Sequence, residues 1–233
     1  MKTLNTTIVS RHYQHKSNVP TEEWLQIVAY NTNAIANQSE WKETARIFWT
    51  DKARTSGTAK EIAKNLELNV TSEQSKDWLW FEPESGPMKE IYRKLSEYYD
   101  VDPDVDKFWY SDNFVDKMQH NQLEGVDFNK LAIFNTTKLY NIVSYLSRNE
   151  NKQADNEINI AGIHGGFFRE SILYALRGDA MPQAWRGQIR MGENFVMKVV
   201  ETDDGEVAMS IDYRGLNKVI TLSEMKSAIV ALR

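Results

Sequence analysis

Apolar and polar positions along the chain follow two periods, which predict strands interleaved with helices. Short apolar runs at 6–10 and at 45–50 (ARIFWT) have the length of buried strands, and 157–166 (EINIAGIHGG) is a further strand that runs into glycines. Apolar residues at helical spacing mark five further segments: 21–37, 55–66, 86–99, 127–149 and 168–178. Thr21 stands where a helix N-cap belongs. Strands that alternate with helices in this way favour an α/β fold.

The C-terminal part of the chain has a different pattern. Residues 193–215 alternate as two strands around an Asp204–Gly205 turn, and a short terminal helix follows. Residues 100–125 are polar, acidic and aromatic without a period, and we interpret them as an insertion or cap. We therefore expect a single domain over 1–233, built as a three-layer α/β/α sandwich with a mostly parallel central sheet.

Composition narrows the class of protein. The 233 residues are 41% hydrophobic and 26% charged, which is ordinary for a globular domain, and the formal charge of −5 argues against a nucleic-acid partner. Without cysteine there is no disulfide, no thiolate nucleophile and no Cys-ligated metal. The sequence has neither a signal-peptide pattern nor an apolar run of membrane-spanning length. These features predict a cytoplasmic protein with no membrane partner.

Three predicted strands end in residues that handle anions. The segments are VSRH, FWTDKAR and AGIHGG, which contribute Arg11, His12, Arg54 and His164. The carboxyl ends of parallel strands meet at one edge of a sheet, so we expect these side chains to converge. Guanidinium forks and imidazoles suit a phosphoryl group, and the glycine pair that begins at Gly165 would let the backbone approach it.

Each residue also has a plainer interpretation. Arg11 and His12 fit a solvated loop, Arg54 fits a surface arginine, and His164 fits a buried structural histidine. A zinc site built on His12 and His15 would need a further ligand, from His120 or a carboxylate.

The same segments resemble motifs of the histidine phosphatase superfamily, which includes phosphoglycerate mutases and many phosphatases. IVSRHYQHKSN resembles the Arg-His-Gly motif, in which His12 would be the nucleophile and Arg11 a phosphate ligand. Asn18 falls where the family often has an asparagine near the phosphate. TDKARTSGTAKEIA resembles the family's arginine segment and aligns Arg54 with it.

Two further motifs complete the resemblance. IAGIHGGFFR resembles the second-histidine motif and aligns His164 and Gly165 with it, and LWFEPESG resembles the segment that carries the proton donor, at Glu82. Glu84 is an alternative donor. Tyr13 departs from the family's pattern, because it replaces the small glycine after the nucleophile.

The resemblance implies a phosphoglycerate mutase-like fold and a phosphatase that hydrolyses a small phosphomonoester through a phosphohistidine on His12. It implies no cofactor and no metal, because the arginines stabilise the charge of the phosphoryl group. We interpret His15 and Lys16 as substrate contacts, with a solvated loop as the alternative. A phosphoglycerate-type mutase, a non-catalytic phosphate-binding protein of the same fold and an unrelated α/β protein remain open. The sequence does not specify the substrate or the oligomeric state.

Overall fold

The computed structural model describes residues 1–12, 15–16, 19–36, 42–49, 53–75, 128–148, 151–163, 192–213 and 216–233. The chain falls into two compact units. One comprises Met1–Phe81, Asn141–Gly165 and Ile189–Leu222, and the other Glu82–Tyr140, Gly166–Gln188 and Ser223–Arg233. All strands of the main sheet lie in the first unit.

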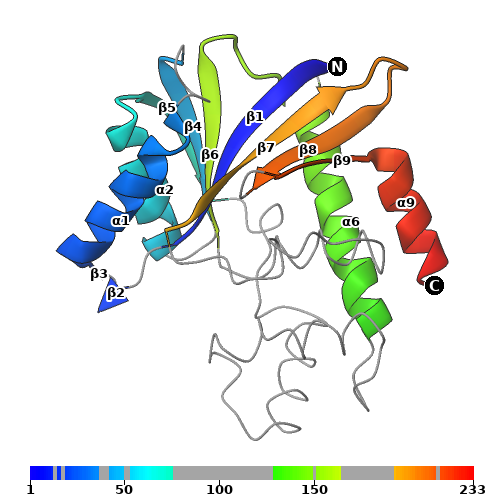
Figure 1. Ribbon diagram of the computed structural model, residues 1–233, viewed down its shortest axis with the longest axis horizontal. Helices are drawn as coiled ribbons and strands as arrows, with labels where there is room; N and C mark the ends of the chain where they lie inside the picture. The colour runs from blue at the N-terminus through cyan, green and yellow to red at the C-terminus, as the bar shows by residue number, and fades with distance from the viewer. Residues whose placement is uncertain are drawn as a thin grey trace, which may run out of the picture. The chain divides into compact units, whose positions relative to one another are not determined.

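Among the described residues, seven strands form one sheet in the order β5-β4-β6-β1-β7-β8-β9 (Figure 1). Their bounds are Lys2–Arg11 (β1), Thr44–Trp49 (β4), Asn69–Ser75 (β5), Glu157–Ile163 (β6), Asn194–Glu201 (β7), Val207–Tyr213 (β8) and Leu216–Thr221 (β9). The pairs β5–β4, β4–β6 and β6–β1 are parallel, whereas β1–β7, β7–β8 and β8–β9 are antiparallel.

The fold is therefore α/β, but the expectation of a mostly parallel sheet is not confirmed. Among the described strand pairs of this sheet, three are parallel and three are antiparallel, because β7, β8 and β9 continue the same sheet beside β1 instead of forming a separate one. Consecutive strands joined by short turns can only pair in the antiparallel sense. The turn between β7 and β8 contains the predicted Asp204–Gly205, and Gly205 has the positive φ of 83° that favours glycine.

Burial along the strands explains which of them the sequence predicts. The last seven residues of β1 and the last six of β6 are buried without interruption, as in strands covered on both faces. By contrast, β5 is polar (NVTSEQS) and lies at the edge of the sheet, with most of its residues exposed. Sequence analysis missed β5 for this reason. It also missed the other edge strand, β9.

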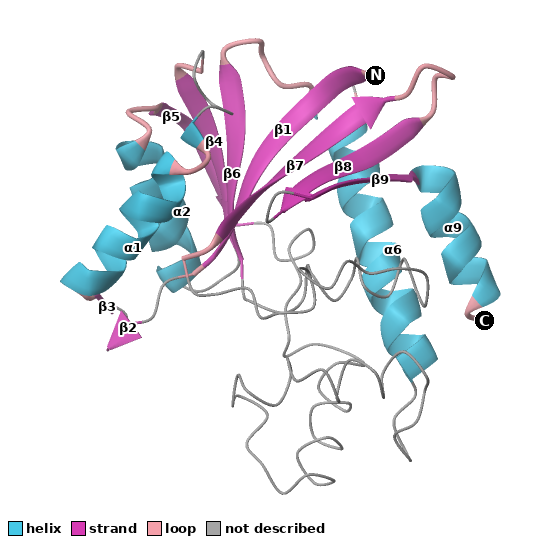
Figure 2. Cartoon of the chain, viewed as in Figure 1, coloured by secondary structure: helices cyan, strands magenta, loops and turns pink. Residues whose placement is uncertain are grey.

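Helices α1 (Glu22–Asn33) and α2 (Ala53–Asn65) pack together, and α2 contacts β1, β4 and β6 (Figure 2). They share an apolar cluster with the strands: Ile8, Val28, Ala45, Ile47, Ala59, Ile62, Ala63, Leu68, Ile158 and Ile160. Because side chains alternate along a strand, even positions of β1 and β6 face these helices and odd positions face away. Thr21 caps α1 as predicted, although its side chain makes no capping hydrogen bond.

The remaining described elements are short or belong partly to the second unit. β2 (His15–Lys16) and β3 (Val19–Pro20) pair as a small antiparallel ribbon. The predicted helix at 127–149 is found as α6 (Phe128–Ser147), and the terminal helix as α9 (Leu222–Ala231). The helices predicted at 86–99 and 168–178 and the cap around 100–125 lie outside the described residues, so the single domain with a cap stays a prediction.

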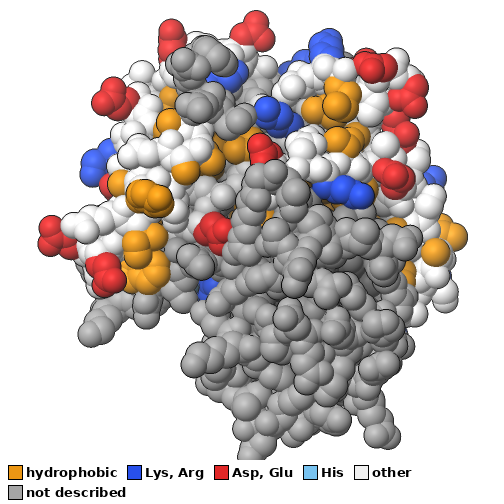
Figure 3. Space-filling model, in the orientation of Figure 1, with side chains coloured by type: hydrophobic (Ala, Val, Ile, Leu, Met, Phe, Trp, Pro, Cys, Tyr) orange, Lys and Arg blue, Asp and Glu red, His pale blue; other side chains and the backbone are white. Residues whose placement is uncertain are grey.

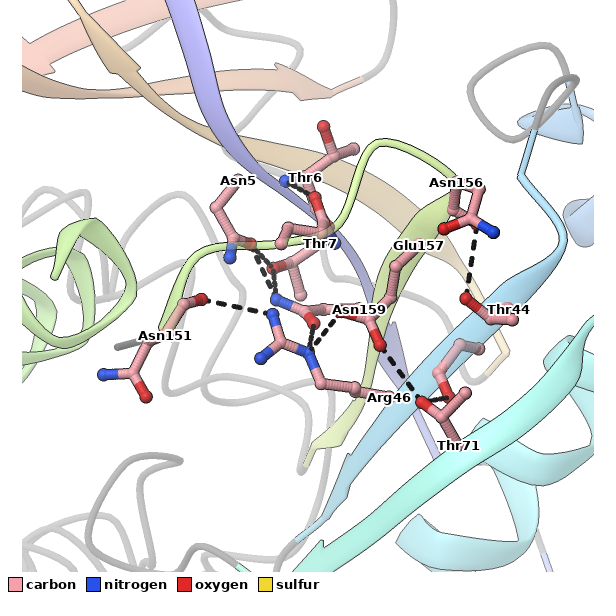
Figure 4. A network of polar contacts seen from close by, with 12 residues as sticks. Asn5, Thr6, Thr7, Thr44, Arg46, Thr71, Asn151, Asn156, Glu157 and Asn159 are labelled. Atoms are coloured by element: carbon pink, nitrogen blue, oxygen red, sulfur yellow. Dashed lines mark hydrogen bonds and ion pairs between the residues drawn. The ribbon is translucent and has the colours of Figure 1, made fainter. Parts of the chain in front are cut away.

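A polar network crosses the face of the sheet that points away from α1 and α2 (Figure 4). Asn159 of β6 donates to Asn5 Oδ1 at 2.6 Å and accepts from Arg46 Nε at 3.1 Å. Arg46 also pairs with Glu157 at 3.0 Å, and Thr71 donates to Glu157 at 3.0 Å. These bonds join β1, β6, β4 and β5 near the amino ends of the parallel strands, at the opposite end from Arg11.

Acidic and basic side chains are interspersed over the described part of the face in Figure 3. Within the portions of the chain that the structure describes, no helix has the length and apolar character needed to cross a membrane.

Candidate active site

The parallel ladders bring the carboxyl ends of β1, β4 and β6 to one edge of the sheet. Arg11, the last residue of β1, lies beside Ile163, the last residue of β6. Trp49, the last residue of β4, lies beside Gly162. The convergence of these strand ends, which the sequence pattern predicted, is confirmed for the described residues.

Arg11 and His12 are buried at this edge, with exposed fractions of 6% and 8%. The His12 amide donates to the Ile163 carbonyl at 2.9 Å, and the Arg11 amide donates to the Glu193 carbonyl at 3.2 Å. The backbone of this pair is therefore held between β6 and the segment that enters β7. The interpretation of Arg11 and His12 as a solvated loop is wrong.

A turn at Gly192 supports Arg11 from the other side. Gly192 has φ of 73°, and its amide donates to the Arg11 carbonyl at 3.0 Å. Asn31 of α1 donates to the Gly192 carbonyl at 2.7 Å. A Cβ at this position would lie 3.3 Å from methyl groups of Ile27 and Val28, so α1 packs directly against the turn.

Arg54 is the second residue of α2 and is partly buried, with its Nε atom shielded from solvent. The first turn of α2 lies against β6 at Gly162, because a Cβ built there would lie 2.0 Å from the Thr55 carbonyl oxygen. This turn contains no acidic residue, and a helix N-terminus carries partial positive charge. The arrangement brings a guanidinium and a helix N-terminus to the carboxyl edge of the sheet.

The other residues singled out in the sequence are described in part or not at all. His15 and Lys16 form β2, four and five positions after Arg11, and only their backbone is described. Asn18, Glu82 and its alternative Glu84, His164, Gly165 and Tyr13 lie outside the described residues. Ile163, the residue that precedes His164 in the chain, accepts the His12 hydrogen bond.

Sequence analysis missed the supports of this edge. A lone glycine inside a strand pattern indicates a close backbone approach, so Gly162 did carry a signal. Asn31 and Gly192 carried none, because their pairing joins segments 161 positions apart. Asn194, the first residue of β7, lies opposite Ser10 and was also missed.

In chemical terms the described part of the edge is suited to binding an anion. Arg11 and Arg54 contribute two guanidinium groups, and a guanidinium binds phosphoryl oxygens in a fork geometry. His12 adds an imidazole, which can donate, accept or attack. Within the described ranges no group of three or more His, Cys, Asp or Glu residues is placed to hold a metal ion.

Comparison with known proteins identifies similar solved structures only. No family model matches the chain, and no curated protein matches it. A phosphoglycerate mutase from Bacillus anthracis is 14% identical, with 97% of each chain covered and a TM-score of 0.46. A phytase from Citrobacter braakii is 12% identical over 100% of this chain and 98% of its own, with a TM-score of 0.49.

A mycobacterial glucosyl-3-phosphoglycerate phosphatase is 15% identical over 89% of this chain and 97% of its own, with a TM-score of 0.45. These three proteins are members of the histidine phosphatase superfamily, which the chain resembles. At TM-scores below 0.5 the likeness assigns no activity and no residue role, so the functional proposal rests on the chain's own residues.

Proposed function

We propose that this protein is a histidine phosphatase, a phosphoric monoester hydrolase that forms a phosphohistidine on His12. The observation that carries the proposal is the burial of Arg11 and His12 at the carboxyl edge of the sheet, with the His12 amide bonded to the residue before His164. A buried guanidinium next to a buried imidazole at the carboxyl edge of a sheet favours an anion site over a solvated loop, because both groups can donate hydrogen bonds to phosphoryl oxygens.

The two arginines would meet a phosphoryl group from two sides. Arg11 occupies an odd position of β1 and so starts on the face away from α1 and α2, whereas Arg54 arrives with α2 on the opposite face. An anion at the edge between them would accept hydrogen bonds from both. Together with His164 they would stabilise the charge on the non-bridging oxygens as it develops in the transition state.

The reaction has two displacements. Neutral His12 attacks phosphorus, the bond between phosphorus and the ester oxygen breaks, and Glu82 gives its proton to the leaving oxygen. Water then attacks the phosphohistidine, Glu82 takes the water proton, and inorganic phosphate and neutral His12 are released. Glu84 is the alternative donor, and no metal is required because cationic side chains stabilise the charge.

The substrate is proposed to be a small phosphorylated molecule. Asn18 and Gly165 would contact its phosphoryl group, and His15 and Lys16 its remaining part. The ribbon of β2 and β3 begins three residues after His12, which keeps both residues near the edge in the chain. We also propose that the fold is a three-layer sandwich. The protein is further proposed to be cytoplasmic and to have no nucleic-acid partner.

The test uses an aryl phosphate such as p-nitrophenyl phosphate. The wild type and the control His120→Ala are expected to release phosphate at similar rates, whereas His12→Ala is expected to lose at least about 10³-fold in kcat/KM. Equal rates for His12→Ala and the wild type would rule out the proposal. Transfer of the phosphoryl group between two substrate oxygens without net release would indicate a mutase instead.

A further inference from the structure

Asn194 has an environment that a purely structural role does not explain. Both polar atoms of its side chain are shielded from solvent and make no hydrogen bond. Among the side chains that the structure describes, it is the only amide for which this holds at both atoms. Buried polar groups form hydrogen bonds in the great majority of cases. A side chain whose two polar atoms are both buried without a hydrogen bond therefore indicates a ligand or a structural water.

The position of Asn194 favours a ligand. It is paired with Ser10, two residues before His12, and Ser10 in turn is paired with Gly162. Residues in register share one face of the sheet, so the three lie in one row. The first turn of α2 lies on this row, because the Thr55 carbonyl occupies the space of a Cβ at Gly162. Asn194 therefore shares its face of the sheet with the turn that contains Arg54.

Asn194 is the first residue of β7, and the two residues before it connect this strand to Arg11 through their backbone. Gly192 has no side chain, and the carbonyl of Glu193 accepts from the Arg11 amide. Asn194 as a whole is partly exposed although its amide atoms are covered, so the amide lies just beneath the surface.

We propose that Asn194 is a substrate-binding residue, whose Nδ2 donates to a phosphoryl oxygen and whose Oδ1 accepts from a hydroxyl or water at the same ligand. The proposal rests on the proposed phosphatase function. This role has a distinctive consequence. A buried amide that makes no hydrogen bond in the protein without ligand lowers the stability of the fold but strengthens ligand binding. A structural residue supports stability and leaves binding unchanged.

The experiment compares Asn194→Ala with the matched control Asn65→Ala. Asn65 ends α2, and its Nδ2 is likewise buried without a hydrogen bond, but it lies at the other end of the helix from Arg54. Thermal unfolding gives Tm without ligand, and titration with inorganic phosphate and with orthovanadate gives Kd. Asn194→Ala is expected to keep or raise Tm and to weaken binding of both anions about tenfold, which corresponds to about 1.4 kcal/mol. Asn65→Ala is expected to bind both anions like the wild type.

A lowered Tm with unchanged Kd in Asn194→Ala would assign the residue a structural role or a bound water and overturn the inference. If Tm and affinity both fall, Asn194→Asp decides, because it keeps the shape and adds a negative charge. Weaker binding of the dianion by Asn194→Asp than by Asn194→Ala supports the contact, and equal or tighter binding contradicts it.

The phosphatase proposal fails separately from this inference. It fails if the wild type binds neither anion and shows no His12-dependent release of phosphate. If the wild type does both and Asn194→Ala binds like the wild type, only the role of Asn194 is lost.

Discussion

His12 follows the last residue of a strand and is nevertheless buried, together with the preceding Arg11. Their backbone is fixed by three hydrogen bonds to two chain segments: one to the end of β6 and two to the Gly192–Glu193 segment that precedes β7. Fixed geometry is what a nucleophile needs, because rate depends on holding the reacting atoms in line.

Arg54→Ala is expected to lower kcat/KM for an aryl phosphate by about 10²–10³-fold, because one positively charged donor to the transition state is lost. Lys60→Ala is the matched control on the same helix. Lys60 is half exposed and pairs with Glu73 at 2.7 Å, an exposed ion pair that contributes at most about 1 kcal/mol. If both variants lose activity equally, Arg54 has no special role and the site lies elsewhere.

Individual residues differ in how far the sequence could predict them. Arg11, His12 and Arg54 follow apolar runs, where function is expected in an α/β sheet, and the pattern therefore made them candidates. Asn194 stands at the head of a strand, where an asparagine is common in any protein. Only the folded structure shows that the amide of Asn194 is buried without a hydrogen bond.

The contact between helix α2 and strand β6 sets the geometry at the carboxyl edge of the sheet. Gly162→Ala would place a Cβ 2.0 Å from the Thr55 carbonyl, so the helix or the strand must move. Overpacking of this kind costs about 1–3 kcal/mol or more, and we expect Tm to fall by about 5 °C or more. Because α2 carries Arg54, phosphate binding should weaken as well.

Gly205→Ala provides the comparison for Gly162→Ala. No atom lies within 4 Å of a Cβ at Gly205, so only its positive φ opposes the substitution, at a cost of about 1 kcal/mol. Thermal unfolding of both variants checks the difference. A Gly162→Ala protein as stable as Gly205→Ala would show that α2 does not press on β6.

The polar network at the amino ends of the strands supports stability and not catalysis. Asn159→Ala removes two hydrogen bonds from this network, the one it donates to Asn5 and the one it accepts from Arg46, at a cost of about 2–3 kcal/mol because the second bond involves a charged group. The control Asn217→Ala alters an exposed edge-strand asparagine paired with Ser210 and should change stability by less than about 0.5 kcal/mol.

Denaturant unfolding measures the stability difference between Asn159→Ala and Asn217→Ala. At a temperature where both variants are folded, their KM for an aryl phosphate should equal that of the wild type. A raised KM in Asn159→Ala alone would mean that the network reaches the site.

Elements were predicted from the sequence where burial gives a clear period. The apolar runs of β1 and β6 lie where both faces of the strand are buried, and the hairpin of β7 and β8 has an alternating pattern and an Asp-Gly turn. Strand direction within the sheet was not predictable, because β7 pairs with β1 across almost the whole chain. The polar edge strand β5 has no apolar period to detect.

For the molecule as a whole, the proposed phosphatase mechanism takes all of its charge stabilisation from side chains. Dialysis against EDTA is therefore expected to leave kcat/KM within about twofold of the untreated protein, since the proposed steps use only arginine, histidine and glutamate side chains. Loss of activity that returns with added Mg²⁺ or Zn²⁺ would contradict the proposed mechanism. The assay is release of phosphate from an aryl phosphate before and after dialysis.

The most direct test of the central claim is isolation of the covalent intermediate. The protein is mixed briefly with an aryl phosphate, quenched in base and digested, and the phosphorylated peptide is sequenced by mass spectrometry. The account predicts one acid-labile, base-stable phosphate on His12, absent from His12→Ala and retained in His120→Ala. A phosphate on another residue, or rapid hydrolysis in His12→Ala, would contradict it.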